Sequence, residues 1–156
     1  MDPQAKSIKN GATVMMIMSI FALVLSLMWI FITEIMFVSD FAAYTGQTFA
    51  DYLVTDPAYA EIYIITKKLL GIVLLATSTL MTYITRKAYS KGERWSWFAL
   101  LVAGGITWGS LIGYKIVIGY FKLGASSMTF IVGAILLAIG LALPAKAILG
   151  REGKTE

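Results

Sequence analysis

Four long apolar stretches, separated by short polar segments, dominate the hydropathy pattern of this 156-residue chain. They cover about residues 12–34, 69–89, 95–114 and 128–149. Each is close to the ~20 residues that a helix needs to cross the ~30 Å hydrocarbon core of a bilayer. A helix satisfies its own backbone hydrogen bonds in that core. The pattern therefore predicts a single all-α domain, an integral membrane four-helix bundle with up-down-up-down topology.

The segment between the first two spans is the one sizeable stretch predicted to lie outside the membrane. Phe41, Tyr44, Phe49 and Tyr52 recur at helical spacing in it, with polar residues between them. This spacing predicts a short amphipathic helix at the outer membrane surface. Gly46 weakens the continuity of this helical pattern.

A second start signal follows this segment, where Asp56 precedes Pro57. Aspartate is a favoured N-cap, and proline suits the first position of a helix. The helical pattern then continues to about Ala88, over ~48 Å at 1.5 Å per residue. Because the hydrocarbon core is only ~30 Å thick, this helix should project beyond the outer face.

Composition supports a membrane protein and excludes several kinds of chemistry. Hydrophobic residues make up 58% of the chain and charged residues 14%, against about 45–50% and 25% in soluble domains. Cysteine and histidine are absent, which removes thiolate chemistry, the commonest metal ligand and the usual general base. We therefore expect no catalytic residue, no metal site and no cofactor. No basic stripe carries interleaved aromatics, so we expect no binding of nucleic acid.

Lysine and arginine are divided unevenly between the two predicted sides of the membrane. Nine of the thirteen lie in the two chain ends and in the turn between the second and third spans. They are Lys6, Lys9, Arg86, Lys87, Lys91, Arg94, Lys146, Arg151 and Lys154. Basic residues concentrate on the cytoplasmic side. The chain is therefore predicted to be a multi-pass protein of the cell membrane with both termini in the cytoplasm.

Four charged residues gather near the outer edge of the predicted spans: Glu34, Lys67, Lys68 and Lys115. Ionisable groups at membrane depth are candidates for function. A structural ion pair with snorkelling lysines is the favoured interpretation because these residues lie at the edge of the spans. A site for a ligand or an ion is the alternative.

Gly105, Gly109 and Gly113 are spaced four apart in the third span and share one helix face. Small residues let helix backbones approach closely in lipid. We expect this helix-packing face to contact another span of the same chain, and a row of alanines in the fourth span matches its spacing. Docking of a second protein is the alternative. With the glycines inside, a partner would bind the bulky face that carries Met15, Met18, Phe130 and Leu137.

Hydroxyl side chains are frequent in the second span. They are Thr77, Ser78, Thr79, Thr82 and Thr85. Hydrogen bonds to neighbouring helices are the favoured role, and lining a polar pathway is the alternative.

The turn before the third span reads Gly92-Glu93-Arg94-Trp95-Ser96-Trp97. It resembles the GERW[AS]W turn of small, uncharacterised four-span membrane proteins from bacteria and archaea. The resemblance implies the same four-span layout and no catalytic residue.

Short loops, small-residue faces and the missing cysteine and histidine favour a non-catalytic accessory or structural subunit. Its expected partners are the lipid bilayer and larger integral membrane proteins, such as an oxidase, a monooxygenase or a transport complex. The alternative is a small homo-oligomeric transporter or lipid-binding membrane protein, for which Glu34 with Lys115 is the best candidate pair. An enzyme is a third possibility, with Asp51, Asp56 and Glu61 as candidate acids.

Overall fold

The computed structural model describes residues 2–119, 121 and 125–150, and this part of the chain is helical and contains no strand. The long helices are α1 (Pro3–Phe31), α4 (Pro57–Lys87), α5 (Arg94–Val117) and α6 (Ala125–Leu149). The shorter elements are α2 (Thr33–Thr45), α3 (Phe49–Thr55) and the 3₁₀ turn η1 (Tyr89–Lys91). The four long helices are each long and apolar enough to cross a membrane, in agreement with the hydropathy pattern.

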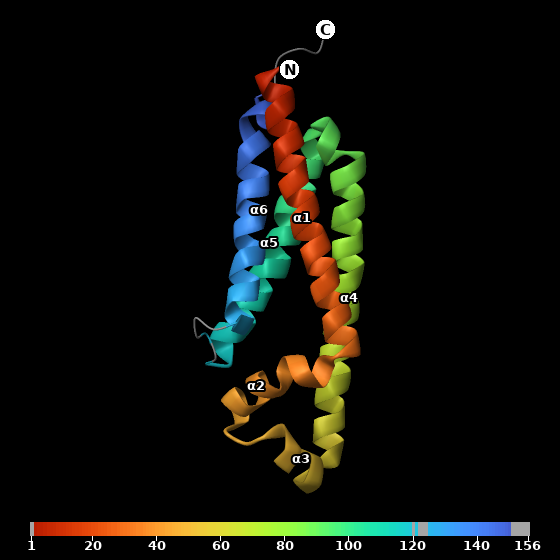
Figure 1. Cartoon of the computed structure of the whole chain (residues 1–156), viewed down its shortest axis with the longest axis vertical. Coiled ribbons are helices and arrows are strands. Elements are labelled where there is room, and N and C mark those ends of the chain that lie inside the picture. The colour runs from red at the N-terminus through yellow and green to blue at the C-terminus, as the bar shows by residue number, and fades with distance from the viewer. Residues whose placement is uncertain (1, 120, 122–124, 151–156) are drawn as a thin grey trace.

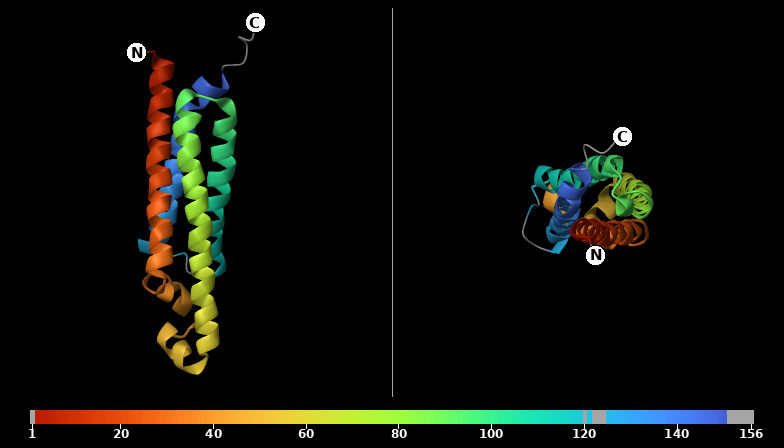
Figure 2. Two further views of the ribbon diagram at one scale, coloured as in Figure 1. Left: turned by 90° about the vertical axis from the view of Figure 1, so that its right-hand side faces the viewer. Right: turned by 90° about the horizontal axis from the view of Figure 1, so that it is seen from above.

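Figure 1 shows α1, α4, α5 and α6 side by side along the long axis of the molecule, with α2 and α3 at one end. α1 packs against both α4 and α6, and α5 packs mainly against α6. The view along the axis in Figure 2 shows the same compact arrangement. We call the end with α2 and α3 the far end. The terminal end holds the start of α1, η1 and the end of α6 (Figure 1).

The buried face of α1 follows a seven-residue repeat. Met15, Ala22 and Trp29 are seven apart and buried, and Met18 and Leu25 are buried between them. Alternating steps of three and four residues keep one stripe turned toward neighbouring helices. This stripe packs α1 against both α4 and α6.

The first predicted span is shorter at its outer end than the sequence pattern suggested. α1 ends at Phe31, the chain turns at Ile32, and Glu34 belongs to α2. The Thr33 hydroxyl donates a 2.6 Å hydrogen bond to the Trp29 carbonyl, which satisfies one of the acceptors left open at a helix end. Hydropathy did not reveal this break, because the apolar run of α1 continues through the turn at Ile32.

The predicted surface helix is two helices. Gly46 ends α2 in the left-handed conformation (φ 72°), which glycine adopts without steric cost. Thr48 then caps α3 by accepting a hydrogen bond from the backbone N–H of Asp51 at 3.2 Å. The Phe41 and Phe49 rings meet with centroids 5.3 Å apart, so the two short helices share a small aromatic core.

The predicted start of the second long helix is confirmed. The Asp56 carboxylate accepts a hydrogen bond from the backbone N–H of Tyr59 at 3.1 Å, and Pro57 is the first residue of α4. Because the cap and the proline are adjacent in the sequence, this start could be predicted without knowledge of the fold.

Candidate functional site

A buried ion pair joins α2 to α5 at the far end of the molecule. The Asp40 carboxylate lies against the Lys115 ammonium group, and the two residues are only 2% and 1% exposed. The Phe130 ring lies 5.6 Å from the ammonium nitrogen. Removing two charges from solvent is costly unless they pair closely. The pair therefore holds α2 in one position across the end of α5.

A second buried lysine lies close to this pair, on α4. Lys67 is 7% exposed, and its ammonium donates a 2.6 Å hydrogen bond to the Tyr114 hydroxyl. The rings of Tyr114, Phe37 and Tyr63 have their centroids 4.0, 5.0 and 5.1 Å from the ammonium nitrogen. Aromatic faces attract a desolvated cation by up to about 2 kcal/mol. The rings therefore replace part of the water that Lys67 has lost.

We call Asp40, Tyr63, Lys67, Tyr114 and Lys115 the polar cluster. A cavity of about 270 Å³ opens beside it and is lined in part by all of these residues except Lys115. Two ammonium groups and one carboxylate leave the polar cluster with an excess of one positive charge. The arrangement can hold a small polar or anionic ligand, and it also ties α2, α4 and α5 together.

The four charged residues predicted to gather at this edge lie in two separate places. Lys67 and Lys115 belong to the polar cluster, whereas Glu34 and Lys68 are exposed and line a separate surface depression. Within the described residues Glu34 forms no ion pair, and the carboxylate that pairs with Lys115 is that of Asp40. One signal could have revealed Asp40: it shares a helix face with Phe37 and Phe41, so it is a charge on an apolar face.

The glycine stripe of α5 faces outward, and the expected contact within the chain is absent among the described residues. Gly105 and Gly109 are exposed and Gly113 is half-buried. A Cβ atom built on any of the three meets nothing within 4 Å. By contrast, a Cβ on Gly104 would lie 2.5 Å from the Leu137 side chain. Gly104 is therefore the glycine that permits α5 to approach α6.

The bulky face that we expected to receive a partner is inside the molecule. Met15, Met18, Phe130 and Leu137 all belong to the hydrophobic core, and none is more than 7% exposed. Interior and exterior are thus reversed relative to the expectation. These four large side chains fill the core, and three of the glycines of α5, Gly105, Gly109 and Gly113, face outward.

The three acids considered for an enzyme form no metal site in the described part of the chain. Asp51 accepts a 2.6 Å hydrogen bond from the Thr48 hydroxyl, and Asp56 caps α4. Within the described residues, no group of three histidine, cysteine, aspartate or glutamate side chains could hold a metal ion. Asp51 and Asp56 have local structural roles at helix starts.

Most hydroxyls of α4 bond to their own helix. Thr77, Ser78, Thr79 and Thr82 donate to carbonyls three or four residues earlier, at 2.8 to 3.0 Å. The expected hydrogen bonds to neighbouring helices are not the ones that these four hydroxyls make. Thr85 differs from them, because its buried hydroxyl oxygen has no partner among the described residues.

In the residues that the structure describes, the protein is all-helical with four candidate membrane spans. No protein-family model, curated protein or solved structure matches the chain. Its function is therefore argued below from its own residues.

Proposed function

We propose that this chain is a non-catalytic integral membrane subunit that packs beside a larger membrane partner. In this proposal α1, α4, α5 and α6 cross the bilayer as an up-down-up-down bundle, and the terminal end lies in the cytoplasm. The concentration of lysine and arginine in the chain ends and in the turn from Arg86 to Arg94 supports this orientation. Insertion in the cell membrane follows from the same assignment.

The outward glycine stripe of α5 is the observation that carries the proposal. Gly105, Gly109 and Gly113 offer a neighbouring helix an open backbone surface. No hydrophobic effect drives helices together in lipid, so their association depends on close packing. A stripe of glycines makes few packing contacts with lipid tails. It makes more packing contacts with the backbone of another helix. We therefore assign this face to a transmembrane helix of the partner.

The experiment compares two leucine substitutions on the exposed face of α5. Gly109→Leu blocks the stripe. Ser110→Leu adds a similar side chain about 100° further around the helix. The tagged chain is purified in a mild detergent, and the proteins that accompany it are quantified for wild type and both variants. Gly109→Leu should release the partner while Ser110→Leu retains it, and both variants should keep the thermal stability of the wild-type chain.

Retention of every accompanying protein by Gly109→Leu would refute docking on the stripe. A wild-type chain that purifies only as a homo-oligomer would replace the subunit proposal with the second candidate described next.

A small homo-oligomeric transporter or lipid-binding protein is the second candidate, and the cavity beside the polar cluster favours it. Lys67 and Asp40 both line that cavity. A transported anion would require the charge of Lys67. Lys67→Met should then abolish uptake into vesicles that contain the purified protein, while Lys68→Met, which removes an exposed charge, leaves uptake unchanged. Uptake by Lys67→Met at the wild-type level would exclude a role of Lys67 in transport.

A further inference from the structure

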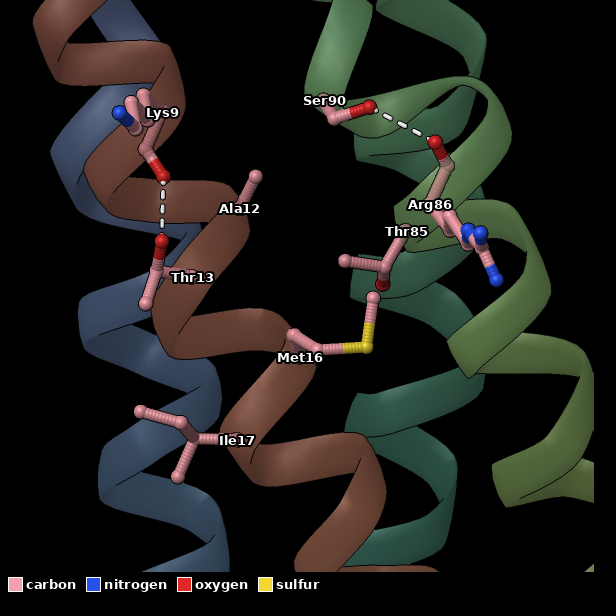
Figure 3. A pocket seen from close by; sticks show the side chains of 8 residues that line it. All are labelled: Lys9, Ala12, Thr13, Met16, Ile17, Thr85, Arg86 and Ser90. Carbon is pink, nitrogen blue, oxygen red and sulfur yellow. Dashed lines mark hydrogen bonds between the residues drawn. The ribbon is translucent and has the colours of Figure 1, made fainter.

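A groove separates α1 from α4 at the terminal end, at the opposite end of the molecule from the polar cluster. Its volume is about 520 Å³, within the ~300–1,000 Å³ typical of small-molecule sites. Figure 3 shows that α1 forms one wall and α4 the other. We call it the α1–α4 groove.

The first observation is the buried hydroxyl of Thr85 in the wall of this groove. Thr85 is 0% exposed, and its hydroxyl oxygen has no hydrogen-bond partner in the described part of the chain. In Figure 3 the side chain projects from α4 into the gap toward Met16. The other groove hydroxyls are engaged: Thr13 donates to the Lys9 carbonyl and Ser90 to the Arg86 carbonyl. An unsatisfied buried hydroxyl is unfavourable, so a ligand with an acceptor oxygen gains by binding here.

The second observation is the charge at the mouth of the groove. Lys9 on α1 and Arg86 on α4 line opposite sides of it, and both are exposed. In Figure 3 the charged ends of both side chains point away from the gap, so each has to turn about its side-chain bonds to face a ligand in the groove. Neither forms an ion pair within the described residues, and no acidic side chain lines the groove. Guanidinium and ammonium groups together favour a phosphate between them.

The third observation is the apolar surface that continues from this basic mouth. Met16 and Ile17 lie further from the terminal end than Lys9 (Figure 3). Ile17 is exposed although it is a large aliphatic residue. In the proposed membrane orientation this surface faces lipid tails, and the basic mouth lies at headgroup depth. Basic pockets between helices on the cytoplasmic side are typical sites for anionic lipid headgroups.

We propose that the α1–α4 groove binds an anionic phospholipid of the cytoplasmic leaflet. Its phosphate lies between Lys9 and Arg86, an oxygen of its glycerol esters accepts a hydrogen bond from Thr85, and an acyl chain runs over Met16 and Ile17. The assignment rests on the proposed membrane orientation, and it is independent of the partner that α5 binds.

Native mass spectrometry of the purified chain tests the site with two defined lipids, phosphatidylglycerol and phosphatidylcholine. The bound fraction of each lipid is measured for wild type, for Lys9→Gln/Arg86→Gln and for the control Lys6→Gln/Lys87→Gln. The control removes two charges at the same end from residues that do not line the groove. Wild type and control should prefer the anionic lipid. The groove variant should lose most of that preference, because the control removes the same amount of charge outside the groove.

Thr85→Val separates a bound lipid from simple charge attraction. Valine keeps the shape and removes the hydroxyl, so the lipid-free variant should be at least as heat-stable as wild type. The stability that added phosphatidylglycerol confers on wild type should be reduced in this variant. Full stabilisation of Thr85→Val by the lipid would overturn the assigned hydrogen bond.

Three results would overturn the lipid site. They are equal binding of both lipids by wild type, equal losses in groove and control variants, and stabilisation by inorganic phosphate that matches that of the lipid. A failure of this kind differs from a failure of the proposed subunit function, because Gly109→Leu is measured by partner retention and lies on another helix.

Discussion

The Tyr89 hydroxyl donates a 2.7 Å hydrogen bond to the backbone carbonyl oxygen of Gly140. Pro144 lies four residues after Gly140 and has no N–H, so α6 cannot satisfy this carbonyl by itself. Trp97 makes a similar contact one residue further on, where its indole N–H donates to the Leu141 carbonyl at 3.0 Å. Side chains from η1 and α5 therefore support the backbone of α6 around its internal proline.

Tyr89→Phe should lower the stability of the chain by about 1–3 kcal/mol, because it leaves a buried carbonyl without a donor. The thermal midpoint in detergent measures the effect. Tyr83→Phe is the matched control, since Tyr83 is an exposed tyrosine near the end of α4. An equal change in the two variants would show that the Gly140 carbonyl does not depend on Tyr89.

Removing one member of the ion pair between Asp40 and Lys115 should destabilise the chain strongly. Lys115→Met leaves a buried carboxylate unpaired, at a cost of about 3–5 kcal/mol. Asp40→Leu combined with Lys115→Met should recover much of that loss, because neither member of the pair is then left buried without its partner. Denaturation in detergent gives the free energies for the double-mutant cycle. Additive losses would contradict the pairing.

Glu34→Gln should leave stability nearly unchanged, because an exposed charge contributes on the order of 0–1 kcal/mol. The same denaturation measurement applies. A loss as large as that of Lys115→Met would show that Glu34, and not Asp40 alone, carries the negative charge of this end.

Substitution by alanine should change the stability of the chain differently at an inward-facing glycine and at an outward-facing one. A Cβ on Gly133 would lie 2.4 Å from the Trp108 ring, whereas a Cβ on Gly105 meets nothing within 4 Å. Gly133→Ala should therefore destabilise the isolated chain. Gly105→Ala should leave it unchanged or raise its stability by up to about 1 kcal/mol, since alanine favours helix. Thermal midpoints of both variants decide whether the faces are assigned correctly.

Single cysteines test the proposed orientation without interference, because the chain contains none. A cysteine at exposed Ser90 should resist a membrane-impermeant thiol reagent in intact cells, and one at exposed Thr48 should react. Both should react after the cells are opened. Labelling of the Ser90 variant from outside would reverse the orientation and remove the cytoplasmic leaflet from the lipid proposal.

Local features of this protein were determined by its sequence alone. Four apolar stretches predicted the four long helices, and Asp56 before Pro57 predicted the start of α4. Both signals depend on residues that are neighbours in the chain, so no tertiary contact is needed to read them. The absence of cysteine and histidine likewise excludes thiolate chemistry and removes the commonest metal ligand, whatever the fold.

Only the tertiary structure decided which helix faces lie inside. Gly104 and Gly105 are adjacent, yet one packs on Leu137 and the other meets open space. In a water-soluble helix a polar face marks the outside, but a membrane helix is apolar all round. The partner of Lys115 was equally hidden, because Asp40 lies 75 positions away and reaches it only after the chain turns at Ile32. Contacts between distant segments depend on that turn and on side-chain packing, and no periodicity within one helix records them.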